Sequence, residues 1–306
     1  MTEGHFAEFF LRQGQKVIET RTCFWYSHRP FLYMSLPYYR ALSPSQGELA
    51  RVIFGGPAAA LRFPAVGQTQ RHIGILVCSD RNYDLASLHP KSRASTRQGL
   101  TNCKVERFDF SYLARHGHQL NEETFRRQGR DVQTITEAQW QRLCQVAGQI
   151  TGFEVWGAFV GGNLAAFSIL AQVGNWVLFQ HGSSATAYLK ENPNNALTFA
   201  VTKSKLADPG VSCLCYGAES PVTPQLDAYK LRMGYRRHAL PERFVYNPLL
   251  QAGLVLGGRK VIYWMARKYP QKEMIRRAAL LLQQDGTQAG MAPAEDSAQA
   301  GLPGVT

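Results

Sequence analysis

LDAYKLRMGY, residues 226–235, predicts a short helix, a glycine that ends it and the start of a strand. Gly234 stands where the C-terminus of a helix needs a residue that adopts positive φ without strain. Tyr235 then opens YRRHAL, a sequence that can form a strand. The neighbouring Tyr229 and Lys230 are therefore expected near the end of a helix whose position is fixed by the turn that follows it.

A β-rich region upstream predicts three antiparallel strands, a polar loop and a helix, in that order. Gly161-Gly162-Asn163 has the composition of a hairpin turn, and Gly174-Asn175 makes a second turn. Asn192, in the sequence NPNN, predicts the start of the helix. The strands are expected at 154–160, 164–170 and 176–181, the helix at 192–207, and a further strand at 211–217.

These two regions together resemble the GNAT superfamily of acyltransferases, in the form found in FemAB-like enzymes of the peptidoglycan or polysaccharide type. Residues 226–235 are similar to the closing pattern L-x-x-F-K-x-x-x-G of those enzymes. The resemblance implies an α/β (α+β) fold of tandem GNAT-like lobes, with mixed, mainly antiparallel sheets flanked by helices. The other segments that follow the FemAB-like pattern are GNLAA at 162–166, Ser183-Ser184, PNNAL at 193–197 and RASTRQGL at 93–100.

The chain divides into four predicted parts. We expect a degenerate N-terminal GNAT-like lobe at 1–125, a C-terminal acyltransferase lobe at 126–248, basic amphipathic helices at 249–285 and a disordered tail at 286–306. The tail is rich in Gly, Ala, Pro and Gln, a composition that does not support a packed core. In the first lobe, helices are expected at 5–13, 44–54 and 83–100, the last broken at Pro90, and strands at 16–20, 23–26, 31–35, 59–63, 72–78 and 103–108.

The resemblance implies attack of an amine on an activated acyl group, and it makes Lys230 the first catalytic candidate. FemAB-like enzymes carry a lysine four residues before the glycine of the closing pattern, and a cation there would stabilise an oxyanion on the acyl carbonyl. Tyr229 and Glu219 are the other catalytic candidates, the latter as a base just after the strand at 211–217. The alternatives are an ordinary surface lysine for Lys230 and a core position for Tyr229.

The loop that binds the donor departs from the pattern of CoA-dependent relatives. Those relatives place the pyrophosphate of CoA on a [QR]-x-x-G-x-[GA] loop that leads into a helix. The corresponding residues 183–195 have no glycine pair, and RRQGRD at 126–131 matches only in part and precedes the first strand. The donor is therefore either acyl-CoA bound in another way or, as the resemblance implies, aminoacyl-tRNA. Its expected contacts are Ser183, Ser184, Asn194 and Asn195.

An anionic acceptor is expected to contact several basic residues. Arg93 and Arg97 are four residues apart, so both lie on one face of a helix and can bind a phosphate together. A small-molecule or lipid-linked precursor of the cell envelope or of a polysaccharide fits this chemistry. The alternative for the two arginines is a solvated helix face. The other acceptor candidates are Arg127, Arg130 and His181, the last with a capping or packing role as its alternative.

The charge of the chain predicts an anionic partner. Its 306 residues carry a formal net charge of +12, with a pI near 9.6. Nucleic acid such as tRNA, a phosphorylated substrate or a membrane face would all complement this charge, and a solvated basic surface is the alternative. Residues 251–285 hold seven cations against two carboxylates, with an apolar stripe at 274–282. This segment predicts peripheral contact with an anionic membrane, or packing on the second lobe.

The six cysteines predict buried thiols in a reducing cytoplasm rather than disulfides or a metal site. None occurs as Cys-x-x-Cys, and only Cys213 and Cys215 are close in sequence. The start of the chain lacks the pattern of a signal peptide, and no apolar run is long enough for a spanning helix. We therefore expect a cytoplasmic acyltransferase, located peripherally at the inner membrane face if residues 251–285 bind lipid. The alternative function is a non-catalytic basic protein that binds nucleic acid or a membrane surface.

Overall fold

A computed structural model gives the structure of the chain and describes residues 1–29, 31–129, 135–219, 224–253 and 258–269. These residues form two compact units. Unit 1 contains residues 1–17 and 74–239, and unit 2 contains residues 18–73 and the described residues from 240 onward. The bounds differ from the expected lobes at 1–125 and 126–248, because residues 18–73 interrupt unit 1 and unit 2 includes residues from 240 onward.

Unit 1 is built on a six-stranded mixed sheet. Neighbouring strands are antiparallel where the pairing is recorded, except for one central pair, which is parallel. The predicted strands over 154–181 are confirmed, and each is slightly longer than expected. The strand order is β5 (Arg71–Cys78), β10 (Cys213–Ala218), β9 (Trp176–Ser184), β8 (Asn163–Val173), β7 (Phe153–Val160) and β6 (Lys104–Phe108).

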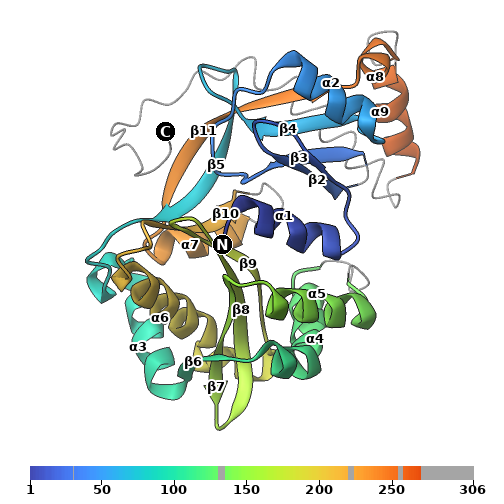
Figure 1. Ribbon diagram of the computed structural model, residues 1–306. Helices are drawn as coiled ribbons and strands as arrows, with labels where there is room; N and C mark the ends of the chain where they lie inside the picture. Colours follow the sequence, from blue (N-terminus) through green and yellow to red (C-terminus); the bar gives the residue numbers. More distant parts are fainter. Residues whose placement is uncertain (30, 130–134, 220–223, 254–257, 270–306) are drawn as a thin grey trace. The chain divides into compact units, whose positions relative to one another are not determined.

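Helices cover both faces of this sheet (Figure 1). On one face, apolar residues of β8, β9 and β10 pack against α6 (Pro193–Ala207), which contacts α3 (Pro90–Asn102). On the other face, Trp140 and Phe167 belong to a core between the sheet, α4 (Phe110–Arg127) and α5 (Glu137–Gln149). The remaining helical elements are α1 (Glu3–Arg12), which packs on α5, and η1 (Leu85–Ser87), η3 (Thr186–Glu191) and α7 (Pro224–Arg232).

Unit 2 has a smaller mixed sheet with one helix in its core. Trp25, Leu61 and Phe63 of the sheet pack against apolar residues of α2 (Gln46–Gly55). The strand order is β1 (Val17–Glu19), β2 (Phe24–Arg29), β3 (Leu32–Leu36), β4 (Ala60–Pro64) and β11 (Arg236–Tyr246). The chain continues into α8 (Pro248–Gly253) and α9 (Arg259–Lys268). The part of the predicted basic helices at 249–285 that follows residue 269, and the tail at 286–306, lie outside the described residues.

The two units repeat one plan. In unit 1, the antiparallel strand β9 leads through α6 to the parallel strand β10, and β5 pairs antiparallel with β10. In unit 2, β3 leads through α2 to the parallel strand β4, and β11 pairs antiparallel with β4. β5 thus completes the sheet of unit 1, and β11 completes the sheet of unit 2. This exchange explains why the units do not follow the order of the sequence.

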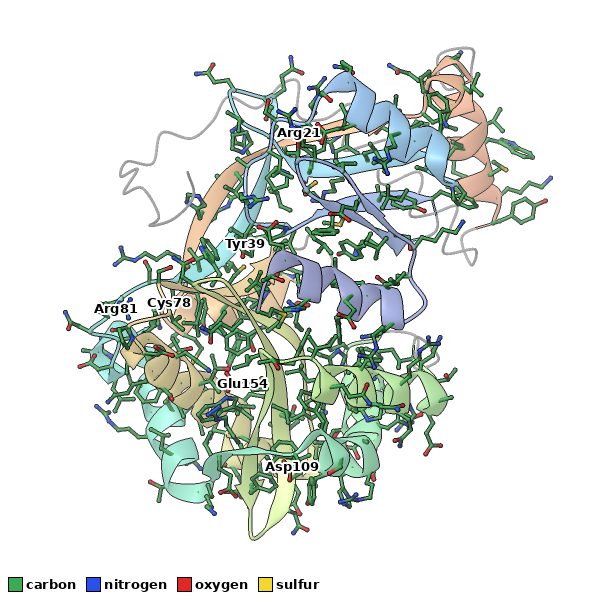
Figure 2. The ribbon with its side chains drawn as sticks, viewed as in Figure 1. Arg21, Tyr39, Cys78, Arg81, Asp109 and Glu154 are labelled. Carbon is green, nitrogen blue, oxygen red and sulfur yellow. The ribbon has the colours of Figure 1, made fainter. Side chains whose placement is uncertain are left out.

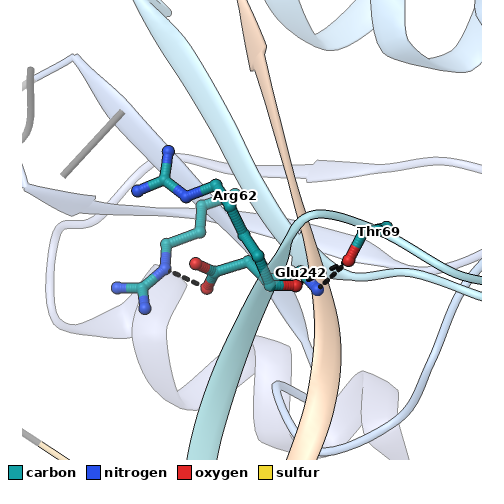
Figure 3. Close-up of polar contacts among 4 residues, drawn as sticks. Arg62, Thr69 and Glu242 are labelled. Atoms are coloured by element: carbon teal, nitrogen blue, oxygen red, sulfur yellow. Dashed lines mark hydrogen bonds and ion pairs between the residues drawn. The ribbon is translucent and has the colours of Figure 1, made fainter. Parts of the chain in front are cut away.

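A buried ion pair fixes β11 beside β4 (Figure 3). Arg62 Nε donates to Glu242 Oε1 at 2.5 Å, and the Glu242 carboxylate is 6% exposed. The backbone N–H of Glu242 also donates to Thr69 Oγ1 at 3.1 Å. Because a buried carboxylate without its cation is costly, a shift of β11 by one residue is strongly disfavoured.

Candidate active site

The two central strands of unit 1 separate soon after they begin. The parallel pairing joins Trp176–Leu178 of β9 to Cys213–Cys215 of β10. In the pairing of β9 with β8, His181 lies opposite Ile169 and Phe179 opposite Leu170, so Gln180 is an extra residue in a β-bulge. A bulge bends its strand and increases the local twist. The recorded pairing of β9 with β10 ends at Leu178 and Cys215, and the two strands splay beyond this point.

Two aromatic rings stand at the mouth of the splay. Phe179 and Tyr216 are the first residues beyond the parallel pairing, and their rings stack with centroids 4.3 Å apart. Tyr235 meets the Tyr216 ring edge-on at 5.4 Å, and its hydroxyl lies 2.7 Å from Thr202 Oγ1. Burial raises the pKa of both Tyr216 and Tyr235, so both phenols stay protonated at neutral pH.

Lys230 lies over the Tyr216 ring and is buried. The residue is 4% exposed, and its ammonium nitrogen is 5.4 Å from the centroid of the Tyr216 ring. Its Nζ donates to Asp227 Oδ1 at 3.1 Å, within the same helix. The alternative of an ordinary surface lysine is therefore wrong. A buried ammonium on an aromatic face, beside a splayed pair of strands, can stabilise negative charge that develops there.

The turn after α7 holds Lys230 in this position. The backbone N–H of Tyr235 donates to Lys230 O at 3.2 Å, and that of Met233 donates to Tyr229 O at 3.0 Å. Gly234 has φ +86°, as predicted for the C-terminus of this helix. A Cβ at Gly234 would also lie 3.0 Å from the carbonyl oxygen of Ser87. Glycine is thus needed at this position for both its φ and its lack of a side chain.

Tyr229 acts through its hydroxyl as a bridge to α6. It donates to Asn194 O at 2.9 Å and lies 3.0 Å from Thr198 Oγ1. Burial raises the pKa of Tyr229 well above its usual value, so the phenol remains neutral. Thr198 and Thr202 are one turn apart on α6 and contact the hydroxyls of Tyr229 in α7 and of Tyr235, the residue just before β11. The helix was predicted but these two threonines were not, because nothing in the sequence indicates that their hydroxyls face buried tyrosines.

A polar network adjoins this aromatic group at the end of β9. Ser184 Oγ accepts from Asn194 Nδ2 at 3.1 Å and from Arg127 Nη2 at 3.0 Å. Asn121 Oδ1 lies 2.7 Å from His181 Nε2 and accepts from Ser183 Oγ at 3.2 Å. Asn194 connects this polar network to the aromatic group, since its side chain contacts Ser184 and its backbone carbonyl accepts from the Tyr229 hydroxyl. The structure thus brings six predicted site residues into one connected region, namely Arg127, His181, Ser183, Ser184, Asn194 and Tyr229.

The other predicted site residues have different surroundings. Glu219 Oε2 accepts from Arg237 Nε at 2.6 Å. Arg93 donates from Nε to Leu88 O at 2.9 Å and from Nη2 to Ala86 O at 3.0 Å, and Arg97 is exposed on the same helix. Asn195 Nδ2 contacts Met233 Sδ at 3.5 Å. Arg130 lies outside the described residues.

The cysteines do not form a metal or redox centre in the described residues, and a hollow on unit 1 lies away from the predicted site. All six cysteines are buried thiols, and burial raises the pKa of Cys78 to about 11 and of Cys144 to about 12. In the described part of the chain, no three His, Cys, Asp or Glu side chains gather in an arrangement that suits a metal ion. A hollow of about 920 Å³ lies beside Asp109 and Glu154, both labelled in Figure 2, and the predicted site residues do not line it.

The comparisons with known proteins concern the fold. No family model matches the chain. No curated protein matches its sequence either. Among solved structures, FemX superposes with a TM-score of 0.59 at 11% identity, covering 81% of this chain and 92% of its own.

Two further solved structures are similar. The C-terminal domain of a protein named as a lysylphosphatidylglycerol synthetase from Agrobacterium fabrum gives a TM-score of 0.53 at 12% identity, covering 83% of this chain and 90% of its own. L-PGS from Bacillus licheniformis gives 0.50 at 9% identity, covering 79% and 87%. The sequence resemblance and the structural similarity agree, and the chain has a FemAB-like GNAT fold.

Proposed function

We propose that the chain is an N-acyltransferase that moves an acyl or aminoacyl group from an activated donor to an amine. The observation that carries the proposal is the buried ammonium of Lys230 at the mouth of the splay between β9 and β10. In this fold the opening gives an extended substrate access to the middle of the sheet. A cation fixed there meets the need of acyl transfer, which creates negative charge on a carbonyl oxygen.

The proposed step follows from the groups around the splay. The amine nitrogen attacks the carbonyl carbon, the new N–C bond forms, and the carbonyl electron pair moves to oxygen. Lys230 stabilises this oxyanion by its charge. Collapse of the intermediate breaks the bond to the leaving sulfur or oxygen, and the proton that the amine loses balances the one that the leaving group gains. Tyr229 is a positioning residue, because its hydroxyl contacts Asn194 and Thr198.

The donor is more consistent with an aminoacyl ester of tRNA than with acyl-CoA bound by a pyrophosphate loop. The first turn of α6, where such a loop would place the pyrophosphate, is packed against α3. A Cβ at Gly99 would lie 2.5 Å from Asn192 O, and Asn192 Nδ2 donates to Gln98 Oε1 at 2.9 Å. Asn102 Nδ2 also donates to Glu191 at 2.6 Å. Protein contacts therefore occupy the end of the helix that binds anions in CoA-dependent relatives.

The acceptor that we propose is an amine on a precursor of the cell envelope or of a polysaccharide. The excess of positive charge suits a phosphorylated or lipid-linked molecule. Arg127 is exposed near Ser184 and can offer its remaining N–H groups to such an anion. The name of one similar structure, a lysylphosphatidylglycerol synthetase, is consistent with an anionic lipid substrate.

The decisive experiment is direct detection of acyl transfer by mass spectrometry. The full chain is incubated with labelled acetyl-CoA or with a set of charged tRNAs, and with acceptors that carry a free amine on an amino sugar or a precursor peptide. We expect a mass increase of one acyl group on the acceptor, larger with charged tRNA. If no acceptor is modified while tRNA or lipid still binds tightly, the chain is a basic binding protein and the proposed activity is wrong.

A further inference from the structure

The large apolar side chains that are exposed belong mostly to unit 2. Only three of those recorded lie in unit 1, and they are spread over separate helices, as is normal for a soluble surface. Several of those in unit 2 come from the end of one sheet and the helices that follow it. Among the described residues of unit 2, the large apolar side chains that are exposed are Phe31, Phe54, Val66, Leu249, Leu250, Val261 and Trp264.

Strand pairing and hydrogen bonds bring Phe31 and α8 to the same end of the sheet. Leu32 lies opposite Ala60, and Ala60 lies opposite Tyr246, so the residues just outside these strands are neighbours. Phe31 O accepts from the N–H of Ala59 at 2.7 Å, and Ala59 O accepts from the N–H of Asn247 at 2.8 Å. Asn247 Oδ1 in turn accepts from the N–H of Leu249 at 3.0 Å. Phe31, Leu249 and Leu250 therefore form one apolar edge, which we call the apolar rim.

Phe31 is presented to solvent in an unfavourable backbone conformation. Its φ is +66°, in the left-handed region that a bulky side chain rarely adopts. Asparagine or glycine would fit this turn with less strain. The turn itself therefore does not require a phenylalanine at this position. The backbone conformation places the aromatic ring of Phe31 on the surface, where the residue is 53% exposed. Strain of this kind is a feature of functional positions.

The exposed face of α9 combines an aromatic ring with cations. Lys260, Val261, Trp264, Arg267 and Lys268 are exposed and recur with helical spacing, whereas the residues between them are half-buried. Lys268 Nζ lies 4.7 Å from the centroid of the Trp264 ring. The sequence of α8 and α9 contains no Asp or Glu. Tryptophan flanked by Lys and Arg is the composition of helices that lie at a membrane–water interface.

We propose that unit 2 binds an anionic lipid membrane through the apolar rim and the exposed face of α9. The rim residues would enter the boundary between headgroups and acyl chains, while the cations of α9 contact the phosphates. Nucleic acid would be attracted by the same cations, but it gives no reason for Phe31, Leu249 and Leu250 to be exposed together. The apolar side chains therefore favour lipid over nucleic acid as the partner. None of the described helices is both long and apolar enough to cross a bilayer, so the contact that we propose is peripheral.

Binding to vesicles tests the proposal with the full chain. We expect co-sedimentation with vesicles that contain phosphatidylglycerol, little with pure phosphatidylcholine, and weakening with salt. Trp264 supplies an internal signal, because Trp25, Trp140 and Trp176 are buried and Trp156 is half-buried. Its emission should shift to the blue on binding and be quenched by brominated lipid. Absence of co-sedimentation with anionic vesicles at low salt would overturn the proposal.

Two triple variants distinguish binding through the cations of α9 from binding through the total positive charge of the protein. Replacing Lys260, Arg267 and Lys268 by Gln should weaken binding by about fivefold per cation, on the order of 100-fold together. The control replaces Arg115, Arg126 and Lys203, three exposed cations of unit 1, and should keep most of the affinity. Equal loss in both triple variants overturns the assignment to α9.

Phe31→Asn provides a variant that should not impair folding. Asparagine suits the positive φ, so the melting temperature should stay the same or rise, while vesicle binding falls several-fold. Leu11→Ser, at an exposed apolar residue of α1, is the control and should leave binding unchanged. If Phe31→Asn and Leu249→Ser bind vesicles as well as wild type, the apolar rim is not part of the contact and the proposal fails. If tRNA displaces the protein from vesicles and vesicle binding depends on the α9 cations alone, the surface is a site for nucleic acid and the proposal also fails.

Discussion

Lys230 is the residue on which the proposed activity depends. It is buried with Asp227 on one side and the Tyr216 ring on the other, so it has a structural contact and a proposed chemical role at once. The structural contact and the chemical role can be separated with two variants. One replaces Lys230 by an uncharged side chain of similar volume, and the other removes the charge of Asp227 while Lys230 remains.

We expect Lys230→Met to lower turnover by roughly 10²-fold or more, the effect of losing one oxyanion donor. Methionine preserves most of the packing, so the melting temperature should fall less than in Lys230→Ala. Asp227→Asn should reduce stability and retain most of the activity, because the ammonium remains. Arg232→Gln, at an exposed cation of the same helix, is the control for charge. Steady-state rates with one donor–acceptor pair check this, and equal losses in Asp227→Asn and Lys230→Met would make Lys230 structural.

Arg93 and Arg97 are expected to differ, although the sequence predicts a shared role. Arg93 donates to the carbonyls of Leu88 and Ala86, and hydrogen bonds from a charged donor contribute about 1.5–3 kcal/mol. Arg93→Gln should therefore lower the melting temperature. Arg97→Gln should leave stability unchanged and, if Arg97 binds an anionic acceptor, raise the KM of that acceptor. Thermal denaturation and initial rates measure both, and a stable Arg93→Gln variant with an altered KM would restore the shared role.

At the scale of elements, the start of α2 is fixed by one carboxylate. Glu48 and Ser45 form a capping box, and Glu48 also accepts from the N–H and the hydroxyl of Thr22. The hydrogen bonds, that from the Ser45 backbone first, lower the pKa of Glu48 to about 2. The ionised group thus stabilises the folded state above its unfolded pKa, near 4.5, and this contribution is lost as the pH falls toward about 2.

Replacing Glu48 by Gln should remove that pH dependence. Glutamine can complete the same capping box, so the helix should still form, but its charge no longer changes. We expect the free energy of unfolding of wild type to decline between about pH 5 and pH 2.5 more steeply than that of Glu48→Gln. Urea denaturation at several pH values measures the difference. Parallel pH profiles for the two proteins would show that the capping box does not contribute to acid stability.

Sequence reasoning found the elements whose signals are local. The strands of 154–181, the turn at Gly234 and the broken helix at Pro90 all depend on hairpin residues, glycine or proline nearby. It missed α4 and α5, and with them Asn121 and Thr124. These two residues are buried polar groups on the packing face of α4, where they contact Ser183 and Ser184 of β9. Both helices have an amphipathic sequence, so the helices themselves could have been predicted, but nothing in the sequence marks Asn121 and Thr124 as buried polar groups that face β9.

At the scale of the whole molecule, the position of β5 and β11 could not be predicted. Pairing of β11 with β4 joins residues about 180 positions apart, and no local pattern reports such a contact. The apolar alternation of each strand indicates a strand but not its neighbour. The tandem character was therefore accessible from resemblance, whereas the composition of each unit required the structure.

Deleting residues 240–306 tests the dependence of unit 2 on its last strand. β4 would lose its antiparallel partner and Arg62 its carboxylate, so unit 2 should unfold while the strands of unit 1 remain protected. Hydrogen exchange followed by mass spectrometry should show rapid exchange over 24–64 and slow exchange over 153–184. A chain shortened only by residues 270–306 is the control and should keep both regions protected. Retained protection over 24–64 after the larger deletion would mean that unit 2 is stable without β11.

The same strand has a consequence for the way the chain is made. β4 leaves the ribosome early, but the residues of β11 that pair with it follow about 180 positions later, which takes on the order of 10 to 35 seconds at usual rates of synthesis. During that interval Phe63, Leu61 and the edge of β4 have no partner on one side. Nascent chains should therefore require a chaperone in this window, and codon choices that slow translation of the second half should lower the yield of folded protein more than those that slow the first.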